Sequence, residues 1–151
     1  MSSRGLLRFL TSAQVIRLYE THITLAKPTQ LPLLESAVYS PQNHKHYGQT
    51  DLFQLAGILA EKLILNHAYQ DGNKRIALLA ADMFLKINGH QLQEEPFGKD
   101  EVDDHLKNAH VAVATHTWTA RDLAESYRSI AKPLDRLTSE IEKYASESEQ
   151  V

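Results

Sequence analysis

Three kinds of chemically active group lie within one nine-residue segment, HAYQDGNKR, at positions 67–75. His67 carries an imidazole, which in its neutral form accepts a proton near neutral pH. Lys74 and Arg75 supply two cations that can bind phosphate, and Asp71 supplies a carboxylate of the kind that binds magnesium. A base, a metal ligand and an anion-binding site are together the groups that phosphoryl or nucleotidyl transfer requires.

The segments on either side of this motif must hold it in place, and both have the pattern of buried helices. Residues 51–66 and 74–88 are apolar on nearly every side, which is typical of helices in the centre of a domain. The second helix is expected to begin near Asn73, where unpaired N–H groups and the helix dipole attract an anion. Gly72 permits a tight turn and a close backbone approach at this end. Cations there oppose the dipole, by roughly 0.3–1 kcal/mol each, which favours a bound anion.

The rest of the chain predicts further helices joined by short loops, so the expected fold class is all-α. Thr11 and Gln14 have the spacing of a capping box, and Pro32 fits the first turn of a helix. Scarce strand signals support the same class. The expected helices lie near residues 11–23, 32–38, 51–66, 74–88, 100–113, 119–130 and 133–144.

Two other segments are predicted to be irregular. Residues 40–50, SPQNHKHYGQT, are polar and contain proline and glycine, which indicates a surface loop or a small hairpin. The second is the tail SESEQV at 146–151, which is expected to fray after a last helix that starts at Pro133.

Composition excludes several classes of protein. The chain has 151 residues, which suits one domain, and no cysteine, which excludes disulfides, thiol catalysis and cysteine-bound metals. With 16 basic and 19 acidic residues the net charge is −3, so neither a basic nucleic-acid clamp nor direct nucleic-acid contact is expected. No apolar run approaches the roughly 20 residues that span a bilayer. We therefore expect a cytoplasmic protein without membrane contact, and no structural metal among its eight histidines.

The motif resembles the signature of the Fic/Doc family, whose general form is His-x-Phe-x-(Asp/Glu)-(Gly/Ala)-Asn-(Gly/Lys)-Arg, with Tyr69 in place of Phe. It is more similar to the Doc (death on curing) branch than to the Fic branch. Lys74 occupies the position where Fic enzymes have Gly, and Leu78 the position of a second Arg. The resemblance covers residues 8–131 of a single domain, 1–151, and residues 132–151 are then a C-terminal helical extension.

The resemblance implies an ATP- and Mg²⁺-dependent protein kinase that acts as the toxin of a toxin–antitoxin system. Its target would be a hydroxyl of a translation factor similar to elongation factor Tu, whose modification arrests translation. By the same resemblance, His67 would take the proton of that hydroxyl and Asp71 would hold Mg²⁺. Gly72 would shape the turn, and Asn73, Lys74 and Arg75 would hold the phosphates.

The resemblance also implies partners and a target-binding segment. A Phd-like antitoxin would fold its disordered tail onto the toxin as a helix. The inhibitory helix of many Fic proteins is not expected, because no Glu here is followed by Gly or Asn. Residues 40–50 match the position of the family's flap, which binds the target backbone by strand addition. The candidate residues of this flap are His44, Lys45, His46 and Tyr47.

Two other functions stay open at this point. One is protein adenylyltransfer of the Fic type, in which AMP rather than phosphate moves to the target. The other is a catalytically weak binding module with the same fold, which Leu65 favours because it is apolar where the Doc branch is expected to offer a cation. His67 and Asp71 favour either enzyme over the binding module.

Overall fold

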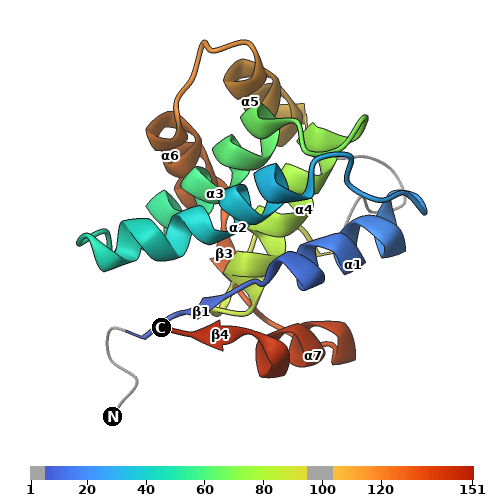
Figure 1. The fold of residues 1–151 in the computed structure, drawn as a ribbon. Helices are drawn as coiled ribbons and strands as arrows, with labels where there is room; N and C mark the ends of the chain where they lie inside the picture. The colour runs from blue at the N-terminus through green and yellow to red at the C-terminus, as the bar shows by residue number, and fades with distance from the viewer. Residues whose placement is uncertain (1–5, 95–103) are drawn as a thin grey trace.

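The computed structural model describes residues 6–94 and 104–151, which form a helical fold with two very short antiparallel ladders (Figure 1). The helices are α1 (Ser12–His22), α2 (Leu31–His46), α3 (Leu52–Asn66), α4 (Asn73–Lys86), α5 (Asp104–Ala114), α6 (Ala120–Ile130) and α7 (Ser139–Glu147). The strands are β1 (Arg8–Phe9), β2 (His90–Gln91), β3 (Lys132–Pro133) and β4 (Glu149–Gln150). The predicted all-α class is confirmed. Residues 100–103 of the helix predicted at 100–113 lie outside the described residues.

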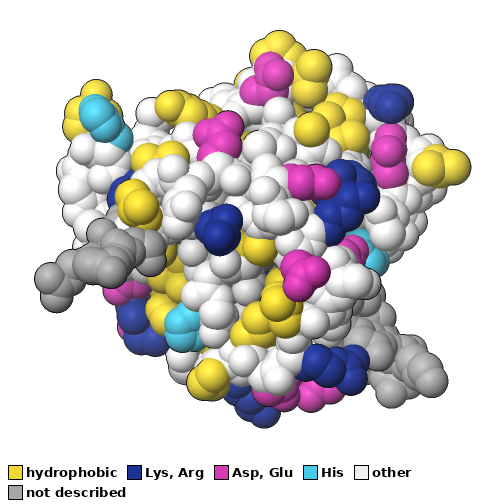
Figure 2. Space-filling model, turned by 90° about the horizontal axis from the view of Figure 1, so that it is seen from below, with side chains coloured by type: hydrophobic (Ala, Val, Ile, Leu, Met, Phe, Trp, Pro, Cys, Tyr) yellow, Lys and Arg dark blue, Asp and Glu magenta, His cyan; other side chains and the backbone are white. Residues whose placement is uncertain are grey.

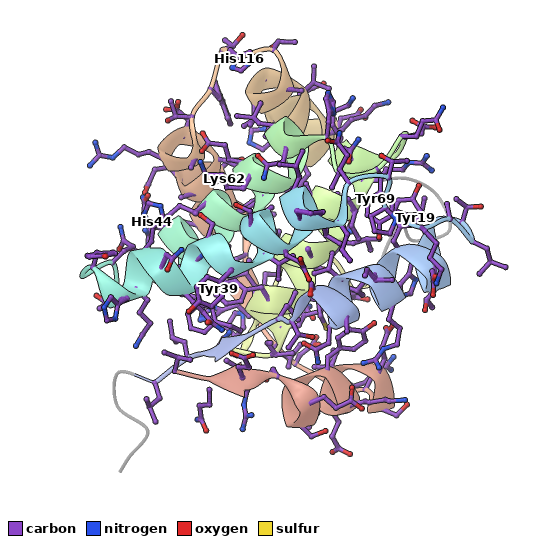
Figure 3. The ribbon with its side chains drawn as sticks, in the orientation of Figure 1. Tyr19, Tyr39, His44, Lys62, Tyr69 and His116 are labelled. Carbon is purple, nitrogen blue, oxygen red and sulfur yellow. The ribbon has the colours of Figure 1, made fainter. Side chains whose placement is uncertain are left out.

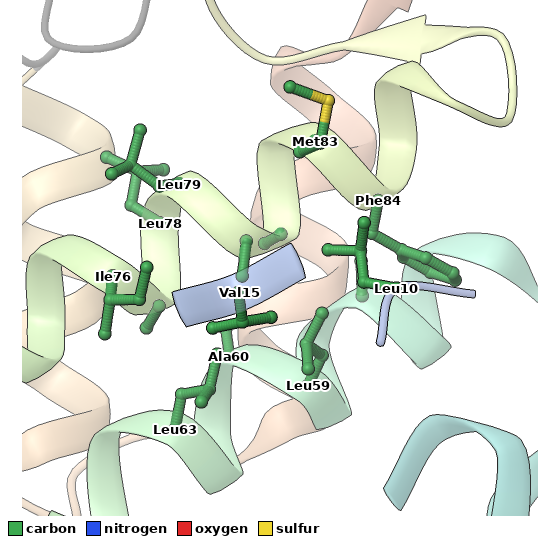
Figure 4. Close-up of a cluster of buried hydrophobic side chains, with 14 of the residues drawn as sticks. Leu10, Val15, Leu59, Ala60, Leu63, Ile76, Leu78, Leu79, Met83 and Phe84 are labelled. Carbon is green, nitrogen blue, oxygen red and sulfur yellow. The ribbon is translucent and has the colours of Figure 1, made fainter. Parts of the chain in front are cut away.

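Helix α3 occupies the centre of the molecule, where it packs against α2, α4 and α6. Its N-cap is Asp51, whose carboxylate accepts the backbone N–H groups of Phe53 and Gln54. Leu59 and Leu63 of α3 meet the apolar face of α4 in a cluster of buried side chains (Figure 4). The two central helices predicted from apolar composition are therefore confirmed, and the segment between them is held by the most buried part of the fold.

Gly57 lets α3 approach α6 more closely than any other residue would. A Cβ at this position would lie 2.5 Å from the carbonyl oxygen of Ala120 and 3.2 Å from the backbone nitrogen of Ala124. Gly57→Ala is therefore expected to lower the free energy of unfolding by about 1–3 kcal/mol, because backbone has to move. The better helix propensity of alanine, about 1 kcal/mol, offsets only part of this. Urea unfolding measures the change, and an equal or higher stability would contradict the packing described here.

Residues 40–46 belong to α2, so the predicted loop or hairpin is wrong for this stretch. Ser40, Pro41 and Gln42 are buried, and the Gln42 amide donates a 3.0 Å hydrogen bond to Glu149. Tertiary packing thus keeps a polar, proline-containing sequence helical, although Pro41 removes one helical hydrogen bond. The helix ends at His46, and its C-cap Tyr47 is followed by Gly48 with φ +111°.

The helix predicted to start at Pro133 begins six residues later, and this prediction is wrong. Pro133 lies in β3 opposite His90 of β2, and the next residue, Leu134, donates its N–H to the carbonyl of Gly89 at 2.9 Å. Proline suits this short edge strand because it needs no donor there. Helix α7 starts instead after Thr138, whose hydroxyl caps it by accepting the N–H of Ile141.

The tail predicted to fray is ordered, because β4 pairs with β1 at the other end of the described chain. Arg8 lies opposite Gln150, and Leu7 and Val151 exchange two backbone hydrogen bonds of 2.9 Å. Helix α7 adds the buried side chain of Tyr144 to the core. The backbone carbonyl of Tyr144 accepts a hydrogen bond from the side-chain amide of Gln14. Helix α7 and β4 are thus packed onto the N-terminal part of the fold.

The surface seen from below, on the side of α7 and β4, carries basic and acidic side chains distributed among one another (Figure 2). This distribution fits the small net charge of −3 and gives that face no extended patch of one sign. Within residues 6–94 and 104–151, no helix has the length and apolar character needed to cross a membrane.

Candidate active site

The candidate site is the turn that joins α3 to α4, and two residues in the left-handed region shape it. His67, the C-cap of α3, has φ 49° and ψ 50°, and Gly72, the N-cap of α4, has φ 78°. A left-handed backbone is uncommon for histidine and ordinary for glycine. The turn brings His67, Asp71, Lys74 and Arg75 to one end of the two central helices with all four side chains exposed.

Asn73 closes this turn from the inside. Its side-chain oxygen accepts the N–H of Tyr69 at 3.0 Å, and its amide donates to the carbonyl of Tyr69 at 2.8 Å. The same amide nitrogen lies 3.4 Å from Nδ1 of His67, at the long limit of a hydrogen bond, which forms only when Nδ1 carries no proton. Asn73 is buried and its side chain is engaged with the turn, which leaves its backbone N–H to face a ligand.

The N-terminus of α4 has the features of an anion-binding site. The first helical bond runs from the N–H of Ile76 to the carbonyl of Gly72 at 2.9 Å. The N–H groups of residues 73–75 therefore have no partner within the helix, and Gly72 provides no side-chain cap. Lys74 and Arg75 are exposed beside them and form no ion pair with the described residues. Backbone donors, the helix dipole and two cations together favour a phosphate group.

Asp71 lies directly before this helix end. One oxygen of its carboxylate accepts the N–H of Gly72 at 2.8 Å, and the side chain is exposed to solvent. The described part of the chain holds no group of three or more His, Cys, Asp or Glu that could enclose a metal ion. A single exposed carboxylate beside a phosphate site fits Mg²⁺, which keeps several waters and binds through few protein ligands.

The turn is also held from outside by residues that the sequence pattern did not single out. The carbonyl of Ala68 accepts the N–H groups of Thr29 and Gln30 at 2.8 and 3.1 Å, which ties the start of α2 to the motif. From α1, the hydroxyl of Tyr19 donates to the carbonyl of Asp71 at 2.9 Å. In the sequence, Tyr19 is only one apolar position of an amphipathic helix, so no local signal marks this contact.

The structure does not bring the predicted flap residues to the motif. His44, Lys45, His46 and Tyr47 lie at the C-terminal end of α2, which runs antiparallel to α3, and Figure 3 shows His44 far from Tyr69. The 15 residues of α3 separate this end of α2 from the motif turn by about 22 Å. The segment beside the motif is instead the link from α1 to α2, which ends in Thr29 and Gln30.

Two apolar residues near the motif differ in their exposure. Leu78 is 3% exposed and packs into the core, whereas Leu65 is 38% exposed on the last turn of α3. Leu78 therefore contributes to packing and offers nothing to a ligand, and the cations available to one come from Lys74 and Arg75.

Comparisons with known proteins agree with the motif. A family model described as the Fic/DOC family matches residues 6–85, just over half of the chain and all of the candidate site. A curated protein named Toxin Doc, from Mycolicibacterium smegmatis, is 44% identical to this chain over 75 residues. The aligned region covers 48% of this chain and 56% of that protein, so the match spans little more than half the relative's length.

Proposed function

Because the chain belongs to the Fic/DOC family, we propose that it is a Doc-like toxin of a toxin–antitoxin system that acts as a protein kinase. The reaction is transfer of a phosphoryl group from ATP to a hydroxyl of a translation factor similar to elongation factor Tu. The observation that carries this proposal is the α3–α4 turn, which presents a histidine and a phosphate-binding helix end together.

The proposed chemistry follows from the positions of the side chains. His67 accepts the proton of the target hydroxyl as its oxygen forms a bond to the γ-phosphorus and the bond to ADP breaks. Nε2 of His67 has no hydrogen-bond partner among the described residues, so this nitrogen is available to the target hydroxyl. The backbone N–H groups of residues 73–75 and the side chains of Lys74 and Arg75 bind the phosphates and stabilise their charge.

Asp71 is the residue that would hold Mg²⁺, because its second carboxylate oxygen is free and exposed. When bound, the ion would neutralise charge on the phosphates. Asp71 keeps its own orientation through the bond from the Gly72 N–H, so the ligand oxygen is held in place before any metal binds.

Phosphoryl transfer is favoured over adenylyl transfer by two positions of α4. Lys74 places a long side chain where Fic members have Gly, and buried Leu78 replaces the guanidinium with which they hold a second phosphate. Lys74 fills space, and Leu78 leaves out a positive charge, that the nucleotide would need in order to bind as it does in the Fic branch. The proposal also includes a Phd-like antitoxin as the partner of the toxin. Because the proposed target acts in translation, we propose that the protein works in the cytoplasm.

The test is to incubate the protein with ATP, Mg²⁺ and elongation factor Tu and to measure the intact mass of the factor. An increase of about 80 Da is expected, because it corresponds to one phosphoryl group. An increase of about 329 Da would show AMP transfer and contradict the argument from Lys74 and Leu78. Absence of any change, together with no binding of ATP, would favour the binding module. A sample without ATP is the control.

A further inference from the structure

Tyr19 of α1 is in contact with the motif turn through both its hydroxyl and its ring. The hydroxyl donates to the carbonyl oxygen of Asp71 at 2.9 Å. The ring stacks on the ring of Tyr69, with centroids 3.8 Å apart and planes inclined by 4° (Figure 3). Tyr19 is 3% exposed, so these contacts are made inside the fold and do not compete with water.

The same ring lies directly against Gly72. A Cβ at this glycine would meet Cε2 and the hydroxyl oxygen of Tyr19, both at 3.3 Å. Gly72 thus serves two purposes, since it adopts φ 78° and leaves room for the tyrosine. The start of α4 therefore packs against Tyr19 of α1 and against Ile23, the C-cap of α1, whose Cγ2 would lie 3.5 Å from the same Cβ.

One peptide group connects Tyr19 to the proposed metal ligand. The carbonyl that accepts the Tyr19 hydroxyl belongs to the peptide bond between Asp71 and Gly72. The N–H of that same peptide group donates to the Asp71 carboxylate at 2.8 Å. Because a peptide group is planar and rigid, a hydrogen bond that fixes its oxygen also fixes the direction of its N–H. The orientation of the carboxylate follows from the position of the Tyr19 hydroxyl.

We propose that Tyr19 is a positioning residue, which orients the Asp71 carboxylate and the phosphate-binding end of α4 through the Asp71–Gly72 peptide group. This inference rests on the proposed function of the turn. Tyr19 is buried behind the turn, and its effect would be exerted on Asp71, the residue that would bind Mg²⁺.

The chain offers a matched control for this role. The hydroxyl of Tyr69, on the other ring of the stack, is buried and has no hydrogen-bond partner among the described residues. Tyr69 is 2% exposed, and burial raises the pKa of its hydroxyl to about 12 because the charged form would be poorly solvated there. Tyr19→Phe and Tyr69→Phe each remove one oxygen atom from the same stacked pair, but only the first removes a hydrogen bond to the turn.

The experiment compares both variants with the original protein in phosphoryl transfer, titrating Mg²⁺ at saturating ATP. Tyr19→Phe is expected to raise the Mg²⁺ concentration for half-maximal rate and to lower kcat/KM about tenfold, the effect of one lost hydrogen bond. Tyr69→Phe is expected to stay within about twofold of the original protein, since its hydroxyl makes no hydrogen bond to the described residues. Equal Mg²⁺ dependence of the two variants would overturn the inference. A loss of activity in Tyr19→Phe that is fully explained by a lower unfolding temperature would overturn it too.

A second measurement separates this inference from the proposed function. Hydrogen exchange and chemical shift of the Gly72 amide report the Asp71–Gly72 peptide group without any substrate. Faster exchange and a shifted resonance in Tyr19→Phe, with neither in Tyr69→Phe, are expected. If the original protein transfers no phosphate, the proposed function fails, and the amide result still decides whether Tyr19 positions the turn. Equal amide behaviour in the two variants would contradict it.

Discussion

His67→Ala is expected to lower the rate of phosphoryl transfer by about 10²–10⁴-fold, because the target hydroxyl then has no base to take its proton. The imidazole is exposed at the C-cap of α3, and its one hydrogen-bonding approach to the described residues is the 3.4 Å distance from Nδ1 to Asn73. Its removal leaves the hydrogen bonds between Asn73 and Tyr69 in place, so the turn should keep its shape. The rate of target modification at saturating ATP measures the effect.

A matched control for this variant is His116→Ala. His116 is also exposed and also has a positive φ, 61°, but it lies in the connection between α5 and α6, away from the motif (Figure 3). Both variants remove a histidine from a left-handed position, so general effects on stability should match. Only His67→Ala should lose activity and, when expressed in bacteria, toxicity. Toxicity that survives His67→Ala would rule out base catalysis and favour sequestration of a partner.

Asp82→Ala is expected to lower the free energy of unfolding by about 3–5 kcal/mol, because it leaves the charge of Lys86 buried without a partner. The two side chains lie on successive turns of α4, 2.8 Å apart, and are 2% and 3% exposed. Asp82 also accepts the N–H of Leu92 at 2.8 Å, which ties the end of α4 to the chain that follows β2. Urea unfolding at neutral pH measures the loss.

A double variant, Asp82→Asn with Lys86→Met, tests whether charge is the cause. It removes both charges and keeps a side-chain oxygen to accept the Leu92 N–H. Burial raises the pKa of Asp82 although Lys86 and backbone donors act in the opposite direction, so desolvation is the largest influence on this carboxylate. The double variant is therefore expected to recover most of the lost stability. A double variant as unstable as Asp82→Ala would show that packing, and not the unpaired charge, causes the loss.

The helices could be predicted where local chemistry determines them. Thr11 and Gln14 form the capping box that their spacing indicates, and the apolar stretches of α3 and α4 are buried. Prediction failed where distant segments decide the structure. Pro41 continues a helix because its neighbours are buried, and Pro133 joins β3 because β2 lies beside it. Neither influence can be deduced from the adjacent residues.

In the candidate site, too, the residues of the local motif could be predicted and the distant residues that support it could not. Its central residues form one continuous segment, so a local motif was sufficient to predict that His67 and Asp71 lie at the same turn. The supports of the turn come from elsewhere in the chain, as Tyr19 in α1 and Thr29 before α2 show. The placement of His44 at the far end of α2 depends on that helix continuing past Pro41, which the sequence pattern did not indicate.

The pairing of β1 with β4 has a consequence for the order of folding. Arg8 and Gln150 lie opposite each other, so this ladder closes nearly the whole described chain into a ring. Closing so long a loop has a large entropy cost and gains little until the intervening helices are packed. We expect the ladder to form late, after the α3–α4 turn, whose contacts lie within the first half of the chain. A chain emerging from the ribosome would thus complete the α3–α4 turn well before the two strands meet.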